Sequence, residues 1–295
     1  GSLRTPASFN AVIGLRPSPG RVPHGPSDQA FNTMSVNGPM GRTVADTALF
    51  LDAMAGQHPE DPISLAAPAQ SFVDSVAACP PPRRVGFSPN LGIVPVDPEV
   101  VSICEQATQH FAAAGAEVVE ACPDFSEAID AFQIIRAQSF ATGMAGHLRD
   151  HCDLLKPEVI WNIEKGLALT ADEIAWAELA RGRLYHNTVR FFADHDLLLC
   201  PAAIVPPFDV DIRYIDNVNG ETFDNYVHWI SITFAVTLTS CPAVSAPAGF
   251  TTSGLPVGLQ IVGPPRGEVQ TLAAAALLEE ATDISSQLPI DPREP

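Results

Sequence analysis

The chain has 295 residues, of which 46 % are hydrophobic, and this fraction excludes an intrinsically disordered chain. Its 34 aspartate and glutamate residues outnumber its 16 lysine and arginine residues, so the net charge is −18 at pH 7. Such a surface repels phosphate backbones and anionic membranes, which argues against a nucleic-acid or membrane partner. No apolar run reaches the roughly 18 residues that a membrane-spanning helix needs.

The first part of the chain contains one well-marked helix. Thr43 is typical of a helix N-cap, with Asp46 three residues later as in a capping box, and Gly56 stands where a glycine commonly follows a helix. Residues 57–83 are rich in proline and alanine and are interpreted as a surface connection.

The next segment has the pattern strand, helix, strand. Residues 84–88 predict a short strand, and Asp97 and Pro98 are typical of the N-cap and first residue of a helix that Gly115 closes. Val118 begins the following strand. A βαβ unit of this kind places its two strands parallel, so the sequence predicts an α/β protein.

A mainly helical region follows at about residues 126–195, with breaks predicted near Lys156 and Thr170. The remaining elements are a short strand, two apolar runs separated by turn residues, and a last helix, at residues 197–200, 243–250, 257–262 and 267–281. We expect residues 1–295 to form one α/β domain with the helical region inserted in its middle.

The motifs of several enzyme classes are missing from the sequence. There is no G-x-S-x-G elbow, no P-loop and no GxGxxG. The six cysteines form no CxxC pair, and Leu148 separates His147 and His151 where a zinc-protease helix has its glutamate. We therefore expect no metal and no organic cofactor, and we interpret the cysteines as reduced residues of a cytoplasmic protein.

Three segments carry a family resemblance, in the same order as in that family. Residues 1–22 read GSLRTPASFNAVIGLRPSPGRV, residues 38–46 read GPMGRTVAD, and residues 254–260 read GLPVGLQ. They resemble the amidase signature family, whose nucleophile lies in Gly-Gly-Ser-(Ile/Leu)-Arg-x-Pro, and the resemblance runs to about residue 281. It implies an α/β fold with a mixed β-sheet core covered by helices, the N-terminal part of which lies outside this chain.

The resemblance assigns roles to three residues at the start of the chain. Ser2 matches the nucleophile that forms an acyl-enzyme, and Gly1 matches the glycine whose backbone N–H contributes to the oxyanion hole. Arg4 matches an arginine that supports the nucleophile loop through an ionic contact. A Gly-Ser pair is also a common remnant of cloning, but the residues that follow it continue the family pattern in register.

The family's catalytic unit is Ser–cis-Ser–Lys, in which the lysine takes the serine proton through the bridging serine. The two other members lie upstream of the nucleophile in the family, and neither Lys156 nor Lys165, the only lysines, matches the catalytic one. We expect them in a missing N-terminal segment, in the same polypeptide or in a separate chain. We also expect the 295 residues alone to be inactive.

The family includes hydrolases of several amide classes and the glutamine amidotransferase subunit that acts on misacylated tRNA. That subunit has a glutamine-binding aspartate at a position that falls near Trp229, and an indole cannot hold an α-amino group as a carboxylate does. We therefore expect a small-molecule amide with apolar or aromatic groups, and we interpret Tyr226, Trp229 and Phe234 as pocket residues, with core packing as the competing explanation. Two alternatives to the hydrolase remain open: the tRNA-linked amidotransferase and a homologue that binds without catalysis. The oligomeric state is also open, with a homodimer as one candidate.

Overall fold

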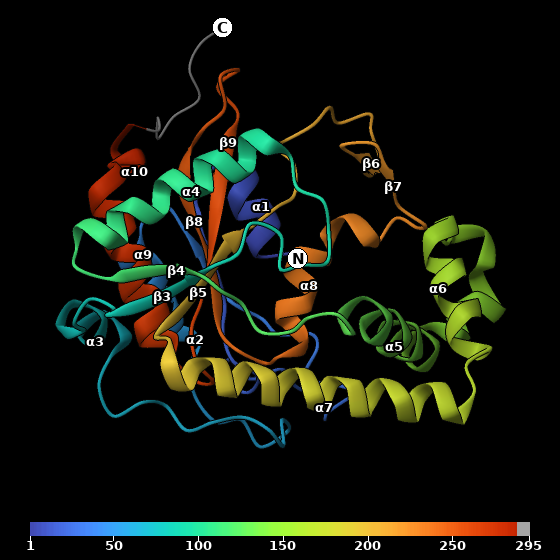
Figure 1. Cartoon of the computed structure of the whole chain (residues 1–295). Coiled ribbons are helices and arrows are strands. Elements are labelled where there is room, and N and C mark those ends of the chain that lie inside the picture. The colour runs from blue at the N-terminus through green and yellow to red at the C-terminus, as the bar shows by residue number, and fades with distance from the viewer. Residues whose placement is uncertain (288–295) are drawn as a thin grey trace, which may run out of the picture.

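The structure is a computed structural model that describes residues 1–287, with a mixed seven-stranded sheet at its centre (Figure 1). Its strands are β1 (Ile13–Arg16), β2 (Met40–Gly41), β3 (Arg84–Phe87), β4 (Glu117–Glu120), β5 (Leu197–Pro201), β8 (Ala243–Phe250) and β9 (Pro256–Val262). The strand order is β2-β1-β8-β9-β5-β3-β4, in which β3 lies parallel to β4 and β5 and the other neighbours are antiparallel. The expected α/β fold with a mixed sheet is confirmed.

The β3-α4-β4 unit forms as its local signals predict. The Asp97 carboxylate accepts hydrogen bonds from the backbone N–H groups of Glu99 and Val100, at 2.8 and 3.3 Å, and caps α4 (Pro98–Ala113). Gly115 has a φ of +97°, a left-handed conformation that lets the chain leave the helix without strain. The chain then returns as β4, which pairs in parallel with β3 along the whole length of both strands.

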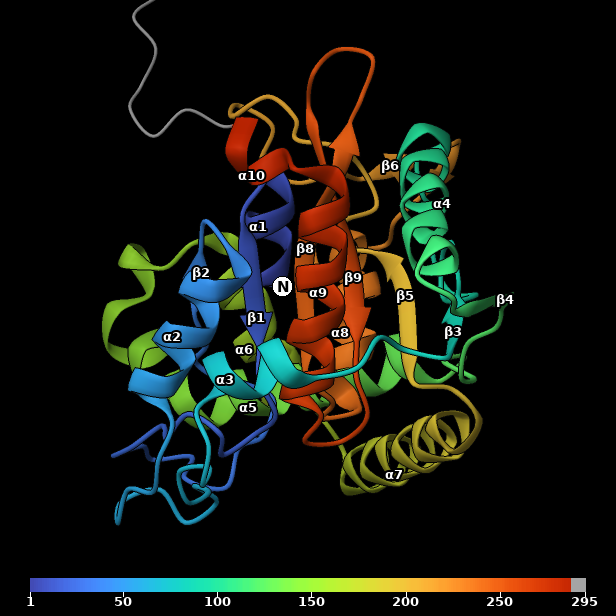
Figure 2. The ribbon, with the colours of Figure 1, turned by 90° about the vertical axis from the view of Figure 1, so that its left-hand side faces the viewer.

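The hairpin of β8 and β9 forms the middle of the sheet. A turn at residues 251–254 joins the two strands, and β5 pairs with the other side of β9. All five residues of β5 are buried, so this strand lies in the core. Helix α9 (Glu268–Thr282) covers one face of the hairpin (Figure 2).

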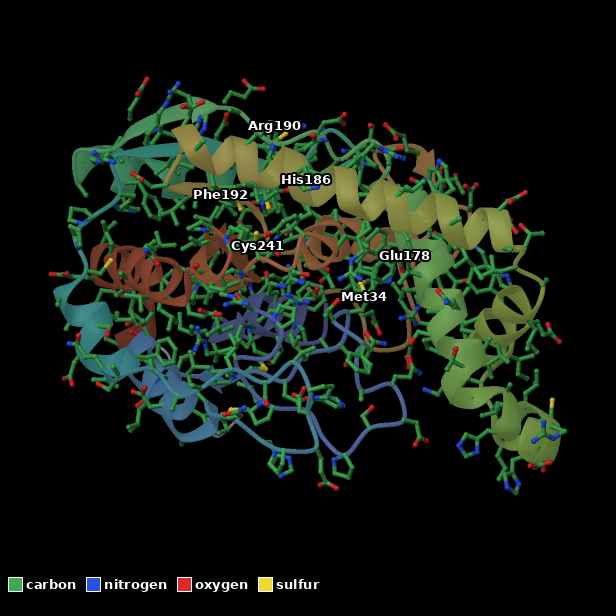
Figure 3. All side chains as sticks on the ribbon, turned by 90° about the horizontal axis from the view of Figure 1, so that it is seen from below. Met34, Glu178, His186, Arg190, Phe192 and Cys241 are labelled. Atoms are coloured by element: carbon green, nitrogen blue, oxygen red, sulfur yellow. The ribbon has the colours of Figure 1, made fainter. Side chains whose placement is uncertain are left out.

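The opposite face of the sheet carries α1 (Arg4–Phe9), which packs on β1, β8 and β9. Four further helices lie beyond α1 (Figure 1). These are α5 (Ala128–His151), α6 (Pro157–Leu167), α7 (Ala171–Asp194) and α8 (Ser231–Leu238). Helix α5 contacts the other three. Figure 3 shows α7 along one side of the molecule, with Glu178, His186 and Arg190 spaced along it.

The breaks predicted within the helical region coincide with helix starts. Lys156 immediately precedes α6, and Thr170 caps α7 in a capping box with Glu173, whose carboxylate accepts from the Thr170 backbone N–H at 2.8 Å. The smaller elements are α2 (Val44–Met54), α3 (Phe72–Ala78), α10 (Ile284–Gln287), the 3₁₀ turns η1 (Cys152–Leu154) and η2 (His228–Ile230), and the hairpin of β6 (Asn217–Val218) and β7 (Glu221–Thr222).

The interpretation of residues 57–83 as a surface connection was incomplete, because α3 lies within it. Ser71 caps this helix through the Asp74 backbone N–H at 3.0 Å, and the Asp52 carboxylate accepts from the Phe72 backbone N–H at 2.6 Å. The Phe72 side chain is 3 % exposed and joins the core. Among the helices of residues 1–287, none is both long and apolar enough to cross a membrane.

Candidate active site

Ser2 is exposed and precedes Leu3, the N-cap of α1. The Thr5 backbone N–H donates to the Gly1 carbonyl at 3.0 Å, which continues the helical turn into the residues before Arg4. Gly14 in β1 allows this approach of helix and sheet, because a Cβ there would clash with the Leu3 carbonyl oxygen. The sheet therefore fixes the position of the segment that carries Ser2.

Gly1 and Ser2 open onto a cavity of about 580 Å³, a size suited to a small organic ligand. Helix α5 contributes one wall, since Phe132, Ile135, Arg136, Ser139 and Phe140 follow the spacing of a single helix face. The remaining lining comes from the residues around α1, from β1, from the loop before β2, and from η2 and α8: Leu3, Arg4, Thr5, Pro6, Arg16, Asn32, Met34, Ser35, Val36, Trp229, Ile230, Phe234 and Thr237.

Arg4 lies beneath this cavity and is 1 % exposed. Its guanidinium donates to the Gln260 amide oxygen and, at 2.8 Å, to the Thr237 hydroxyl. Both acceptors are neutral, so the expected ionic contact of Arg4 has no counterpart within residues 1–287 and stays a prediction. Gln260 presents its amide oxygen to Arg4 because its amide nitrogen donates to the Ile232 carbonyl at 3.2 Å. The support that Arg4 gives to the start of the chain is thus a buried hydrogen-bond network.

The charges around the cavity are positive. Burial, reinforced by the neighbouring Arg16, lowers the pKa of Arg4 to about 9. Burial, reinforced by Arg181, lowers the pKa of Arg16 to about 10. Three arginines line the cavity, the third being Arg136, and no aspartate or glutamate is among its lining residues in the described part of the chain. An electropositive cavity therefore lies inside a protein with a net charge of −18.

Two of the three predicted pocket residues line this cavity. Trp229 is half-buried, stacks on Phe9 with ring centroids 6.5 Å apart, and meets Phe208 edge-on at 5.6 Å. Phe234 is 1 % exposed and stacks on Phe132 at 3.9 Å, so it belongs both to the wall and to the core. Both residues thus have aromatic packing partners, as the competing explanation requires, and those of Trp229 do not line the cavity.

Tyr226, the third, is not among the described residues that line this cavity, and its role as a pocket residue stays a prediction. Its hydroxyl oxygen accepts hydrogen bonds from Arg136 at 3.0 Å and from the side-chain amide of Asn162. Its ring packs edge-on against Trp161, with centroids 6.1 Å apart. Donors from α5 and α6 therefore hold the hydroxyl of Tyr226, and this hydroxyl in turn accepts from Arg136, which does line the cavity.

Sequence reasoning missed Arg136 and the contribution of α5. The signal was present in the periodicity of Phe132, Ile135 and Ser139, a helix face in which Arg136 is the charged member. The two lysines lie elsewhere, Lys156 at the start of α6 and Lys165 on that helix, and neither lines the cavity. In the part of the chain that the structure describes, no group of three or more histidine, cysteine or acidic side chains could hold a metal ion.

Comparisons with known proteins agree with this architecture. The chain is 31 % identical over 297 residues to an acylamidase from Rhodococcus erythropolis and 27 % identical over 316 residues to a subunit of the glutamyl-tRNA(Gln) amidotransferase from Azorhizobium caulinodans. These matches cover 99 % of this chain in both cases, but 61 % and 62 % of the relatives, so the chain spans about three fifths of their length.

Among solved structures, a bacterial aryl acylamidase of the amidase signature enzymes superimposes with a TM-score of 0.84 at 26 % identity. The match covers 98 % of this chain and 63 % of that enzyme. A family model described as Amidase matches residues 1–272. The three motifs, the mixed sheet and these matches lead to one conclusion: the chain belongs to the amidase signature family.

Proposed function

We propose that the protein hydrolyses carboxylic amides to an acid and ammonia or an amine, with Ser2 as the nucleophile. The observation that carries this proposal is the exposed residue Ser2 on a cavity of about 580 Å³, within the family's nucleophile motif. The similarity to an acylamidase supports it. The reaction needs no cofactor, so we expect exhaustive chelation to leave the activity unchanged.

The reaction follows from the chemistry of a weak nucleophile. The Ser2 oxygen attacks the amide carbonyl carbon while its proton passes through a bridging serine to a neutral lysine. The Gly1 backbone N–H, the proposed oxyanion donor, stabilises the negative oxygen that forms, an effect worth roughly 3–4 kcal/mol per donor in a comparable hydrolase. The C–N bond then breaks as the amine takes the proton, and water hydrolyses the serine ester.

The base and the bridging serine are proposed to come from outside these 295 residues. The chain's only lysines, Lys156 and Lys165, do not line the cavity. The relatives are longer than this chain, which spans 61 % of the acylamidase. The partner that we propose is therefore a lysine-bearing N-terminal segment. As a separate proposal, the protein acts in the cytoplasm.

Apolar or aromatic amides are the proposed substrates. Trp229, Phe132 and Phe140 line the cavity, and a wall of aromatic rings favours apolar groups. The alternative function is that of the tRNA-linked amidotransferase, to one of whose subunits the chain is also similar. It is disfavoured because no acidic side chain among the described lining residues could bind the α-amino group of glutamine.

The test uses the whole protein, with its lysine-bearing segment, and a neutral aryl amide such as 4-nitroacetanilide. Ser2→Ala should lower kcat by several orders of magnitude, since the nucleophile is removed. Ser35→Ala, the matched control, removes another hydroxyl from the same cavity and should retain the rate within a few-fold. An acylated Ser2 should be detectable by mass spectrometry of quenched reactions, whereas full activity of Ser2→Ala rules out this nucleophile. Glutaminase activity together with co-purifying partner proteins would favour the amidotransferase instead.

A further inference from the structure

Arg136 differs from the other two arginines of the cavity. Arg4 and Arg16 are 1 % and 4 % exposed and donate to several neutral acceptors of the protein. Arg136 is only half-buried and makes one hydrogen bond, to the Tyr226 hydroxyl, among residues 1–287. Since a guanidinium carries five N–H donors, Arg136 retains donors for a ligand.

The guanidinium of Arg136 is nevertheless held in place. It lies over the Phe140 ring, 4.4 Å from the centroid, while one terminal nitrogen donates to Tyr226. Tyr226 is itself anchored by the side-chain amide of Asn162 and by Trp161. A preorganised guanidinium loses little conformational freedom on binding, which favours recognition of a planar anion.

Among residues 1–287, no carboxylate forms an ion pair with Arg136. The buried Nε atom of this residue finds no acceptor there either. The lining of the cavity adds two more arginines and, among residues 1–287, no acidic residue. An unpaired cation at the wall of a cavity is stabilised when a ligand brings the opposite charge.

A second cavity of about 310 Å³ adjoins the first and shares Asn32, Ser35, Val36 and Ser139 with it. Its lining includes Asp28 and Asp61, so it disfavours an anion. The first cavity is lined by arginines and the second by aspartates, so a negatively charged group of a ligand is expected to bind beside Arg136 in the first.

We propose that the cavity selects amides that carry a carboxylate, and that Arg136 binds this carboxylate. The inference rests on the proposed function and deepens it, because it adds an anionic group to the apolar substrate that the aromatic wall favours. Arg136 is then a specificity-determining residue, and Tyr226 is a positioning residue that acts through it.

The test measures binding, so it does not depend on turnover. The 295-residue chain is titrated by calorimetry with 4-acetamidobenzoate and with 4-nitroacetanilide, which replaces the carboxylate by a neutral group of the same shape. A second pair, succinanilate and butyranilide, places the carboxylate on the acyl side. We expect at least one anionic ligand to bind about tenfold more tightly than its neutral partner, as a charge-assisted bidentate contact implies.

Four variants separate recognition from structure. Arg136→Met should abolish the anionic preference, Arg136→Lys should keep a part of it, and Tyr226→Phe should reduce it because the guanidinium loses its anchor. Arg149→Met is the matched control, since it removes the same charge from the same helix at a side chain that is 75 % exposed. It should leave the preference unchanged.

The outcomes are decisive in either direction. If Arg136→Met keeps the wild-type preference, whether or not its melting temperature falls, Arg136 has only a structural role and the inference is wrong. Failure of the folded wild-type chain to prefer either carboxylate overturns it as well. Absence of hydrolysis of neutral 4-nitroacetanilide by the whole protein contradicts the proposed function instead, and leaves the binding preference as a separate result.

Discussion

Replacing Trp229 by alanine tests whether the aromatic wall selects substrates. Trp229 lines the cavity and packs on Phe9 and Phe208, so the substitution removes apolar contact area from any aromatic ligand. The lost contact is worth about 1–3 kcal/mol, which corresponds to a decrease in kcat/KM of about 5-fold to 150-fold for aromatic amides. An amide of the size of acetamide has no aromatic group to contact the indole, and its kcat/KM should change little.

The assay compares kcat/KM for acetanilide and acetamide, together with the melting temperature, in the whole protein. Phe208→Ala is the matched control, because Phe208 shares the contacts with Phe9 and Trp229 but does not line the cavity. Both variants lose aromatic packing worth about 0.5–1.5 kcal/mol per ring pair, so both should melt at a lower temperature. Only Trp229→Ala should change the ratio of the two substrates. An unchanged ratio in that variant would remove Trp229 from the substrate site.

Three further predictions follow from the structure. The 295-residue chain alone should hydrolyse simple aryl amides no faster than the buffer does, because neither of its lysines lines the cavity; enzyme-like turnover by the purified chain would refute this argument. Gly14→Ala should destabilise the protein by about 1–3 kcal/mol and lower its activity, because the new Cβ meets the Leu3 carbonyl. Gly182→Ala in α7 places its Cβ in open space, so thermal unfolding should show the protein stabilised by about 0.5–1 kcal/mol. Burial raises the pKa of Glu279, whose carboxylate accepts from the Val44 backbone N–H, so its contribution to stability is full below pH 4.5 and is lost as the pH rises through the folded pKa. The difference in melting temperature between the wild type and Glu279→Gln should therefore shrink or reverse over that pH range. A difference that stays constant with pH contradicts the assignment.

Local signals in the sequence were sufficient to place most elements. Asp97 and Thr170 cap helices through contacts within three residues, and such contacts depend only on neighbouring sequence. The seven-stranded order could not be read in this way, since it depends on pairings between strands far apart in the chain. The expected mixed sheet therefore came from the family resemblance and not from the periodicity.

The candidate site was predicted less completely, for the same reason. The roles of Ser2 as nucleophile and of Gly1 as oxyanion donor stay predictions. Their position at a cavity could not be read from the sequence and comes from the structure. Arg4 donates to Gln260, which is 256 positions away in the chain. The residues next to either one in the sequence do not predict this neutral partner. The contacts of Tyr226 likewise depend on Asn162, on a different helix, whose side-chain amide donates to the tyrosine hydroxyl.

The contrast between an acidic exterior and an arginine-lined cavity has a consequence for kinetics. An anionic substrate is repelled by the net charge of −18 at long range and attracted by Arg4, Arg16 and Arg136 only once it is inside. Salt screens exposed charges beyond about 10 Å at 0.1 M and weakens contacts with buried groups much less. The association rate of such a substrate should therefore rise with ionic strength, opposite to the usual behaviour of an enzyme that steers its substrate by charge.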